Sequence, residues 1–165
     1  MSVKVSAASN YGGGMNLESH ASGNDEIYAL IGRLNAAWAS LDYIMRLALK
    51  RKRGVGINSP ESDNIFGSRN HAEVIGFLLA EYAGNQAVLD ELRKIGKSKD
   101  GPEYYGRRNN YIHALWAKDD KGQSVFQRIG ANDWRKPVDF SASEINSLIA
   151  DIEKTAFEIE RLTKI

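Results

Sequence analysis

Cysteine is absent from the 165 residues of this chain. Its absence excludes a disulfide framework, a thiolate zinc site, an iron–sulfur cluster and a cysteine nucleophile. An excess of one charge is missing too, because 22 Lys and Arg residues are balanced by 21 Asp and Glu residues. Binding to nucleic acid would therefore depend on a local patch, since the whole molecule has almost no net charge.

Long apolar runs are also missing. No stretch approaches the roughly 18 consecutive apolar residues that cross a bilayer. The N-terminal residues lack the basic and then apolar pattern of a signal peptide, because residues 6–14 are mostly small, polar or glycine. We therefore expect a cytoplasmic protein that has no membrane partner.

The first 23 residues contain few large apolar side chains. Such a segment buries too little surface to offset its ordering entropy, so residues 1–23 are predicted to form a flexible tail. The overall composition, with 42% hydrophobic and 26% charged residues, is that of one globular domain. We expect this domain to span residues 24–165.

Helical periodicity dominates the domain. Apolar residues from 27 to 48 recur in steps of three and four, which predicts a long first helix. Asn24 is a suitable N-cap for it. The basic run over residues 50–53, followed by Gly54, is typical of a helix C-terminus.

The middle of the chain is expected to be a loop over residues 54–63, a second helix over 68–83 and a short apolar helical stripe over 88–95. The second helix would point five side chains inward: Ala72, Ile75, Leu78, Leu79 and Tyr82. Pro102 suits the first position of a further helix, because its missing N–H is not needed there. That helix would carry Tyr105, Arg108, Ile112 and Leu115.

The pattern changes after Trp116. Residues 119–122 indicate a turn, and residues 124–129 and 135–139 are predicted to be short strands of a hairpin. Residues 141–144 then form a Ser-x-x-Glu capping box before the last helix. Its apolar face would consist of Ile145, Leu148, Ile149, Ile152, Ala156, Ile159 and Leu162. The expected fold is all-α, an antiparallel four- to five-helix bundle with a small β-hairpin insertion before the last helix.

Histidine is scarce, with three residues in the chain: His20, His71 and His113. The run His71-Ala72-Glu73 has the His-x-Glu part of a zinc-deaminase signature, but the Pro-Cys-x-x-Cys part is absent. No two histidines are four residues apart, which excludes a zincin-type site. We therefore expect neither a metal nor another cofactor.

The surroundings of His113 are the strongest candidate site. Arg107, Arg108 and Asn109 lie within about two helical turns of it. Asn109 and His113 are four residues apart, so the amide is placed to orient the imidazole. Arg108 lies about 140° around the helix axis from His113, and its long side chain or a second subunit would have to close that gap.

Such a set suits cleavage of a phosphodiester that carries its own nucleophile. In RNA the adjacent 2′-OH attacks phosphorus, and a histidine accepts that proton or donates one to the leaving 5′-oxygen. An arginine stabilises the charge that grows on the phosphorane. This mechanism needs no metal, and DNA lacks the hydroxyl that it requires.

Structural explanations stay open at this point. Arg107 and Arg108 would also fit surface ion pairs, and His113 would also fit between helices. Asp42 would either ion-pair with Arg108 and hold its side chain or be a solvated acid. Residues 50–53 would contact RNA phosphates or merely complement the helix dipole. Four aromatic residues would stack on RNA bases or belong to the core or a dimer interface: Tyr104, Tyr105, Tyr111 and Trp116.

The run from Arg108 to His113 resembles the Arg-x(4–6)-His signature of the HEPN superfamily. In that family the residue after the arginine is commonly Asn, Asp or His, and here it is Asn109. The resemblance covers roughly residues 24–165 and implies a four- to five-helix bundle that usually dimerises. Leu115 stands where members that act as toxins beside nucleotidyltransferase antitoxins commonly carry a tyrosine.

The resemblance implies metal-independent endoribonuclease activity in a toxin–antitoxin, antiviral defence or RNA-processing setting. By match to the motif, Arg108 would stabilise the phosphate, His113 would be the acid–base group and Asn109 would orient them. Arg107 and Tyr111 are the expected substrate contacts. The expected partners are a second copy of the chain, an RNA substrate and a protein antitoxin or effector. Some family members bind nucleotides or partners without cleaving anything, and this alternative remains.

Overall fold

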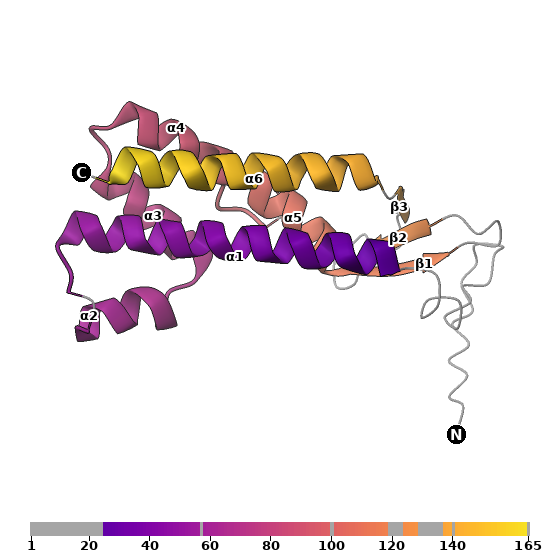
Figure 1. Ribbon diagram of the computed structural model, residues 1–165, viewed down its shortest axis with the longest axis horizontal. Coiled ribbons are helices and arrows are strands. Elements are labelled where there is room, and N and C mark those ends of the chain that lie inside the picture. The colour runs from indigo at the N-terminus through magenta and orange to yellow at the C-terminus, as the bar shows by residue number, and fades with distance from the viewer. Residues whose placement is uncertain are drawn as a thin grey trace, which may run out of the picture.

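The computed structural model describes residues 25–56, 58–99, 101–118, 124–128, 137–139 and 141–164, and this part of the chain is mostly helical (Figure 1). The result agrees with the expected all-α class. Several expectations lie outside the described residues. They concern the tail over residues 1–23 with His20, the N-cap Asn24 and the turn over 119–122.

The first helix, α1, spans Asp25–Arg53, as its apolar spacing predicts. It ends in the basic turn, and Gly54 follows with a φ of 64°, the left-handed conformation that glycine tolerates. Its inward side chains Leu34, Leu41 and Met45 are fully buried. Helix α1 thus supplies one wall of the core.

The segment after α1 is helical where the sequence predicts a loop. Pro60–Asp63 form the short helix α2 and Asn64–Ser68 the π-helical turn η2, with Ser59 as an N-cap that accepts a bond from the N–H of Ser62. Pro60 stands at the start of α2, where its ring fits, so the proline begins a helix and does not mark a loop.

Helix α3 spans His71–Glu81 and starts later than predicted. Asn70 and Glu73 form a reciprocal capping box at its N-terminus, each side chain bonding the other's backbone N–H at 3.0 Å. Ile75 and Leu78 are buried as expected, whereas Ala72 is exposed. The expected inward position of Ala72 is therefore wrong.

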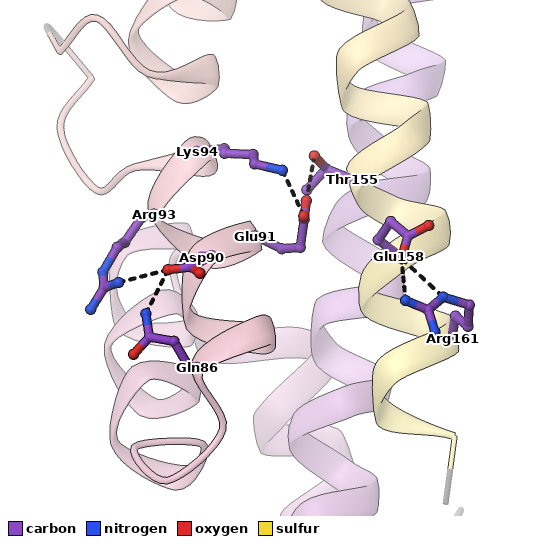
Figure 2. A network of polar contacts seen from close by, with 8 residues as sticks. All are labelled: Gln86, Asp90, Glu91, Arg93, Lys94, Thr155, Glu158 and Arg161. Carbon is purple, nitrogen blue, oxygen red and sulfur yellow. Dashed lines mark hydrogen bonds and ion pairs between the residues drawn. The ribbon is translucent and has the colours of Figure 1, made fainter.

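Helix α4 spans Gln86–Ile95, and its predicted apolar residues are all buried: Val88, Leu89, Leu92 and Ile95. Figure 2 shows how α4 is tied to the last helix. Glu91 accepts a hydrogen bond from the Thr155 hydroxyl at 3.1 Å and one from the Lys94 ammonium at 2.6 Å. Thr155 is buried, so this hydrogen bond lies at the edge of the core between α4 and α6.

Helix α5 spans Tyr104–Ile112 and is shorter than predicted. Its N-cap is Glu103, so Pro102 precedes the helix and does not begin it. Leu115 is not helical, because Ala114–Lys118 form strand β1 and pair with strand β2. Residues 114–118 therefore belong to a paired strand and not to the helix.

Three antiparallel strands in the order β1-β2-β3 make a small sheet. Strand β2 spans Ser124–Arg128 and β3 spans Pro137–Asp139, with Phe126 opposite Trp116 on one side and Val138 on the other. The two strands that the sequence predicts correspond to β2 and β3. Strand β1 is the addition that the sequence analysis missed.

The last helix, α6, spans Ala142–Thr163. Ser141 caps it by accepting the N–H of Glu144 at 3.2 Å. Every predicted apolar position is buried except Leu162, which is half-buried. Helix α6 is therefore the element that the sequence describes best.

Helices α1 and α6 run parallel to each other, side by side (Figure 1). Arg33 near the start of α1 bonds Asn146 near the start of α6 at 3.4 Å, and Arg51 and Glu160 interact near their ends. The two longest helices therefore run in the same direction.

Candidate functional site

Arg108 is held where α5 lies against α1. Its Nη1 donates to Asn109 Oδ1 at 3.0 Å, and its Nη2 donates to Asn35 Oδ1 of α1, also at 3.0 Å. The guanidinium carbon lies 5.5 Å from the centre of the Trp38 ring. Two amides and one aromatic face therefore fix the guanidinium in place.

The charge of Arg108 has no acidic partner within the described part of the chain. Both hydrogen-bond acceptors are neutral amide oxygens, and its buried Nε atom has no partner there. Burial lowers the pKa of Arg108 from its ordinary value, because partial removal from water disfavours the charged guanidinium. An anion arriving from solvent would therefore meet a charge that no carboxylate of the described residues compensates.

Asn109 is almost fully buried, with 3% of its surface exposed. Its amide oxygen accepts from Arg108, so it positions the guanidinium, whereas the sequence suggests that it orients His113. Its backbone carbonyl accepts the N–H of His113, the residue that caps the C-terminus of α5. The His113 side chain itself is exposed.

Arg107 and Tyr111, the two expected substrate contacts, have different surroundings. Arg107 is half-buried on α5. The Tyr111 hydroxyl donates to Glu144 of α6 at 3.1 Å, and burial, followed by this bond and the Glu144 charge, raises the pKa of Tyr111 to about 12. Tyr111 thus joins α5 to α6, which is a structural role beside the expected substrate contact.

Asp42 does not form the expected ion pair with Arg108. Its carboxylate pairs with Arg46 one turn along α1, at 2.6 Å from Nε. Arg46 also donates to the backbone carbonyls of Ile65 and Arg69. The i, i+4 spacing explains the partner of Asp42, because side chains four residues apart lie next to each other on the surface of one helix.

A ring cluster that the sequence analysis missed lies behind Arg108. The His71 ring is 4.3 Å from the Tyr105 ring and 4.9 Å from the Trp38 ring, which Arg108 also contacts. His71 Nε2 donates to the carbonyl of Gly96 at 3.1 Å. The cluster thus links α3, the end of α4, α5 and α1.

Gly106 lets α5 approach the preceding loop. A Cβ at this position would collide with the backbone carbonyl oxygen of Gly101. Any larger side chain would push α5 away from the loop. This close approach sets the position of the helix that carries Arg108 and His113.

Three residues of the basic run over residues 50–53 contact aromatic rings of the protein. The Lys50 and Lys52 ammonium groups lie over the rings of Phe66 and Tyr82, at 5.9 and 5.3 Å. Arg53 lies over a further aromatic ring and pairs with Glu81 at 2.9 Å. Contact of this run with RNA stays a prediction.

The stability of the fold should fall as the pH drops below about 6.5, because the half-buried His71 has a lowered pKa in the folded state. Burial is the main cause that lowers the pKa of His71 from its ordinary 6.5. The neighbouring Arg46 and Arg108 charges lower it further, against the Gly96 bond and the Asp42 charge. Above pH 6.5 both the folded and unfolded imidazoles are neutral; between 6.5 and the lower folded pKa the unfolded state binds the extra proton.

Melting temperatures at pH 8 and pH 5.5 test this expectation. Wild type should lose stability across the interval by more than a His71→Gln variant, whose amide retains a donor for the Gly96 carbonyl. Equal losses in the two proteins would show that other groups cause the pH dependence.

Comparison of the chain with models of protein families, with curated proteins and with solved structures finds no match. None of the described helices is both long and apolar enough to span a bilayer. Among the described residues, no three His, Asp or Glu side chains are grouped so that they could hold a metal ion. The site must therefore be interpreted from its own chemistry.

Proposed function

We propose that this protein is a metal-independent endoribonuclease that cleaves single-stranded RNA. The proposal includes a HEPN-like four- to five-helix bundle with the small sheet as its β-hairpin insertion. It also includes a cytoplasmic homodimer in a defence, toxin–antitoxin or RNA-processing setting, with a protein antitoxin or effector as a further partner. Arg108 and His113 would act on the RNA, with Asn109 as the positioning residue.

One observation carries the proposal: a fixed guanidinium that has no carboxylate partner among the described residues lies on α5, and an exposed imidazole lies at the C-cap of the same short helix. Structural arginines at partly buried sites usually pair with acids, because an unpaired charge is costly. Arg108 is a charged residue at such a site, so the fold bears the free-energy cost of its partial burial. A phosphodiester is the ligand that such a guanidinium best complements.

The proposed reaction is transesterification at phosphorus. The 2′-OH of one nucleotide attacks the adjacent phosphorus as its proton passes to a base. The bond to the 5′-oxygen of the next nucleotide breaks, and that oxygen takes a proton. His113 would accept or donate one of these protons, and Arg108 would stabilise the negative charge on the non-bridging oxygens. The products would be a 2′,3′-cyclic phosphate and a 5′-hydroxyl.

A dimer would solve a geometric difficulty of the single subunit. Arg108 and His113 are five residues apart, which places them about 140° apart around the axis of α5. Arg108 is directed toward α1, whereas His113 stands at the end of the helix. Two copies facing each other would allow the arginine of one and the histidine of the other to reach a single phosphate.

Digestion of a single-stranded RNA in EDTA tests the proposal. The wild-type protein should cut it to products ending in 2′,3′-cyclic phosphate, and should leave the matching DNA intact because DNA has no 2′-OH. A strict requirement for Mg²⁺, or equal cutting of the DNA, would contradict the mechanism.

A second candidate is a non-catalytic module for dimerisation, protein interaction or nucleotide binding. It is favoured by the fact that two of the Arg108 N–H groups are already bonded to Asn35 and Asn109. Under this alternative, Arg108→Ala and His113→Ala would lower the melting temperature or the dimer fraction on a sizing column. RNA would remain intact with wild type and variants alike, and a calorimetric titration would detect nucleotide binding.

A further inference from the structure

Asn35, on the exposed face of α1, carries an inference that rests on the proposed function. The residue is exposed, and its amide oxygen accepts from Arg108 Nη2 at 3.0 Å. An aspartate would fit the same space and would form an ion pair with the guanidinium. The chain has an amide there, which holds the guanidinium in place and leaves its charge available.

The N–H donors that have no acceptor among the described residues define the ligand. A guanidinium has five N–H groups, and each Nη of Arg108 carries a second N–H beside the one bonded to Asn109 or Asn35. The Asn35 amide turns its oxygen toward Arg108, and the NH2 group on the same carbon of this exposed side chain supplies further N–H donors beside the guanidinium. Several N–H donors of one site around one uncompensated charge match the oxygens of a phosphate group.

We propose that Asn35 is part of the RNA-binding site, where it donates to the same backbone phosphate as Arg108 and keeps the arginine charge unneutralised. In this role it selects for an anionic ligand at the junction of α1 and α5. The role depends on its being an amide: a carboxylate at this position would replace the phosphate as the partner of Arg108.

Binding of a single-stranded 2′-O-methyl RNA, labelled with fluorescein and followed by anisotropy, tests this role apart from cleavage. The methyl group blocks the attacking hydroxyl, so the probe is bound and not cut. Asn35→Asp should weaken binding by about tenfold or more, because one charge is neutralised and another repels the phosphate. Asn35→Ala should weaken it by only about threefold, since it removes one hydrogen bond and leaves the charge.

Asn146→Asp is the matched control. Asn146 is exposed on α6 and accepts a hydrogen bond from Arg33 of α1 at 3.4 Å, so the variant has the same change in charge next to another arginine. It should bind the probe within about twofold of wild type, because it lies outside the site. The melting temperature of Asn35→Asp should be no lower than that of wild type, because the new carboxylate gains a partner.

Wild-type affinity in Asn35→Asp would overturn the inference, and so would equal losses in the two aspartate variants. If Asn35→Asp proves unstable, the alanine variant decides, because equal or better binding than wild type by Asn35→Ala also contradicts donation by this amide. Absence of any probe binding by wild type overturns the inference as well. Probe binding with the expected variant order, but without cleavage of unmodified RNA, would remove the nuclease proposal and leave the phosphate site.

Discussion

Replacing His113 by alanine should slow RNA cleavage by about 10²–10⁴-fold, the usual contribution of a general acid–base group. The His113 side chain is exposed at the C-terminus of α5. The hydrogen bond that His113 donates to α5 comes from its backbone N–H, which alanine retains. The variant should therefore fold as wild type does and bind RNA with similar affinity. Initial rates of cleavage in EDTA at saturating RNA measure the loss in kcat.

Arg108→Ala provides the second half of this test, with Arg93→Ala as its control. Arg108→Ala should lower both the affinity for RNA and the cleavage rate. Arg93 of α4 is exposed and pairs with Asp90 (Figure 2), so its removal changes the net charge equally at another place. Cleavage by His113→Ala and Arg108→Ala at the wild-type rate would show that neither residue takes part in the reaction.

Replacing Arg46 by alanine should lower the free energy of unfolding by about 3–5 kcal/mol, the usual effect of breaking a buried, hydrogen-bonded ion pair. Only 8% of the Arg46 surface is exposed. The guanidinium joins Asp42 of α1 to the carbonyls of Ile65 and Arg69, so one substitution leaves three acceptors without their donor. The loss should be a large fraction of the stability of a domain of this size.

Urea unfolding of wild type, Arg46→Ala and Arg93→Ala measures this effect. The exposed Arg93–Asp90 pair should contribute less than about 1 kcal/mol. A loss in Arg46→Ala as small as that of Arg93→Ala would mean that water replaces the lost contacts, and that Arg46 does not hold η2 and the start of α3 against α1.

Local pattern was sufficient to predict the helices whose apolar residues recur at helical spacing. The inward residues of α1, α4 and α6 are buried because a stripe of large aliphatic side chains leaves few other arrangements. Ser141 was also predictable as a cap, since its hydroxyl lies at the right distance along the chain from the N–H of Glu144.

Features that depend on distant residues were not predictable in this way. Strand β1 forms where a helix was expected, because its pairing with β2 outweighs local preference. The contact between Asn35 and Arg108 joins residues 73 positions apart, and no spacing rule connects them. His71 carried a misleading metal-site pattern, whereas its actual neighbours are aromatic rings from two other helices.

The parallel course of α1 and α6 has a practical consequence for attaching the protein to a surface. The starts of α1 and α6 lie toward the end of the molecule that carries the sheet, and the C-terminal end of α6 lies at the opposite end (Figure 1). The 22 residues of α6 separate the two ends by about 33 Å. Immobilisation through an affinity tag on the C-terminus should therefore leave the face with Arg108 open to incoming ligands in a biosensor.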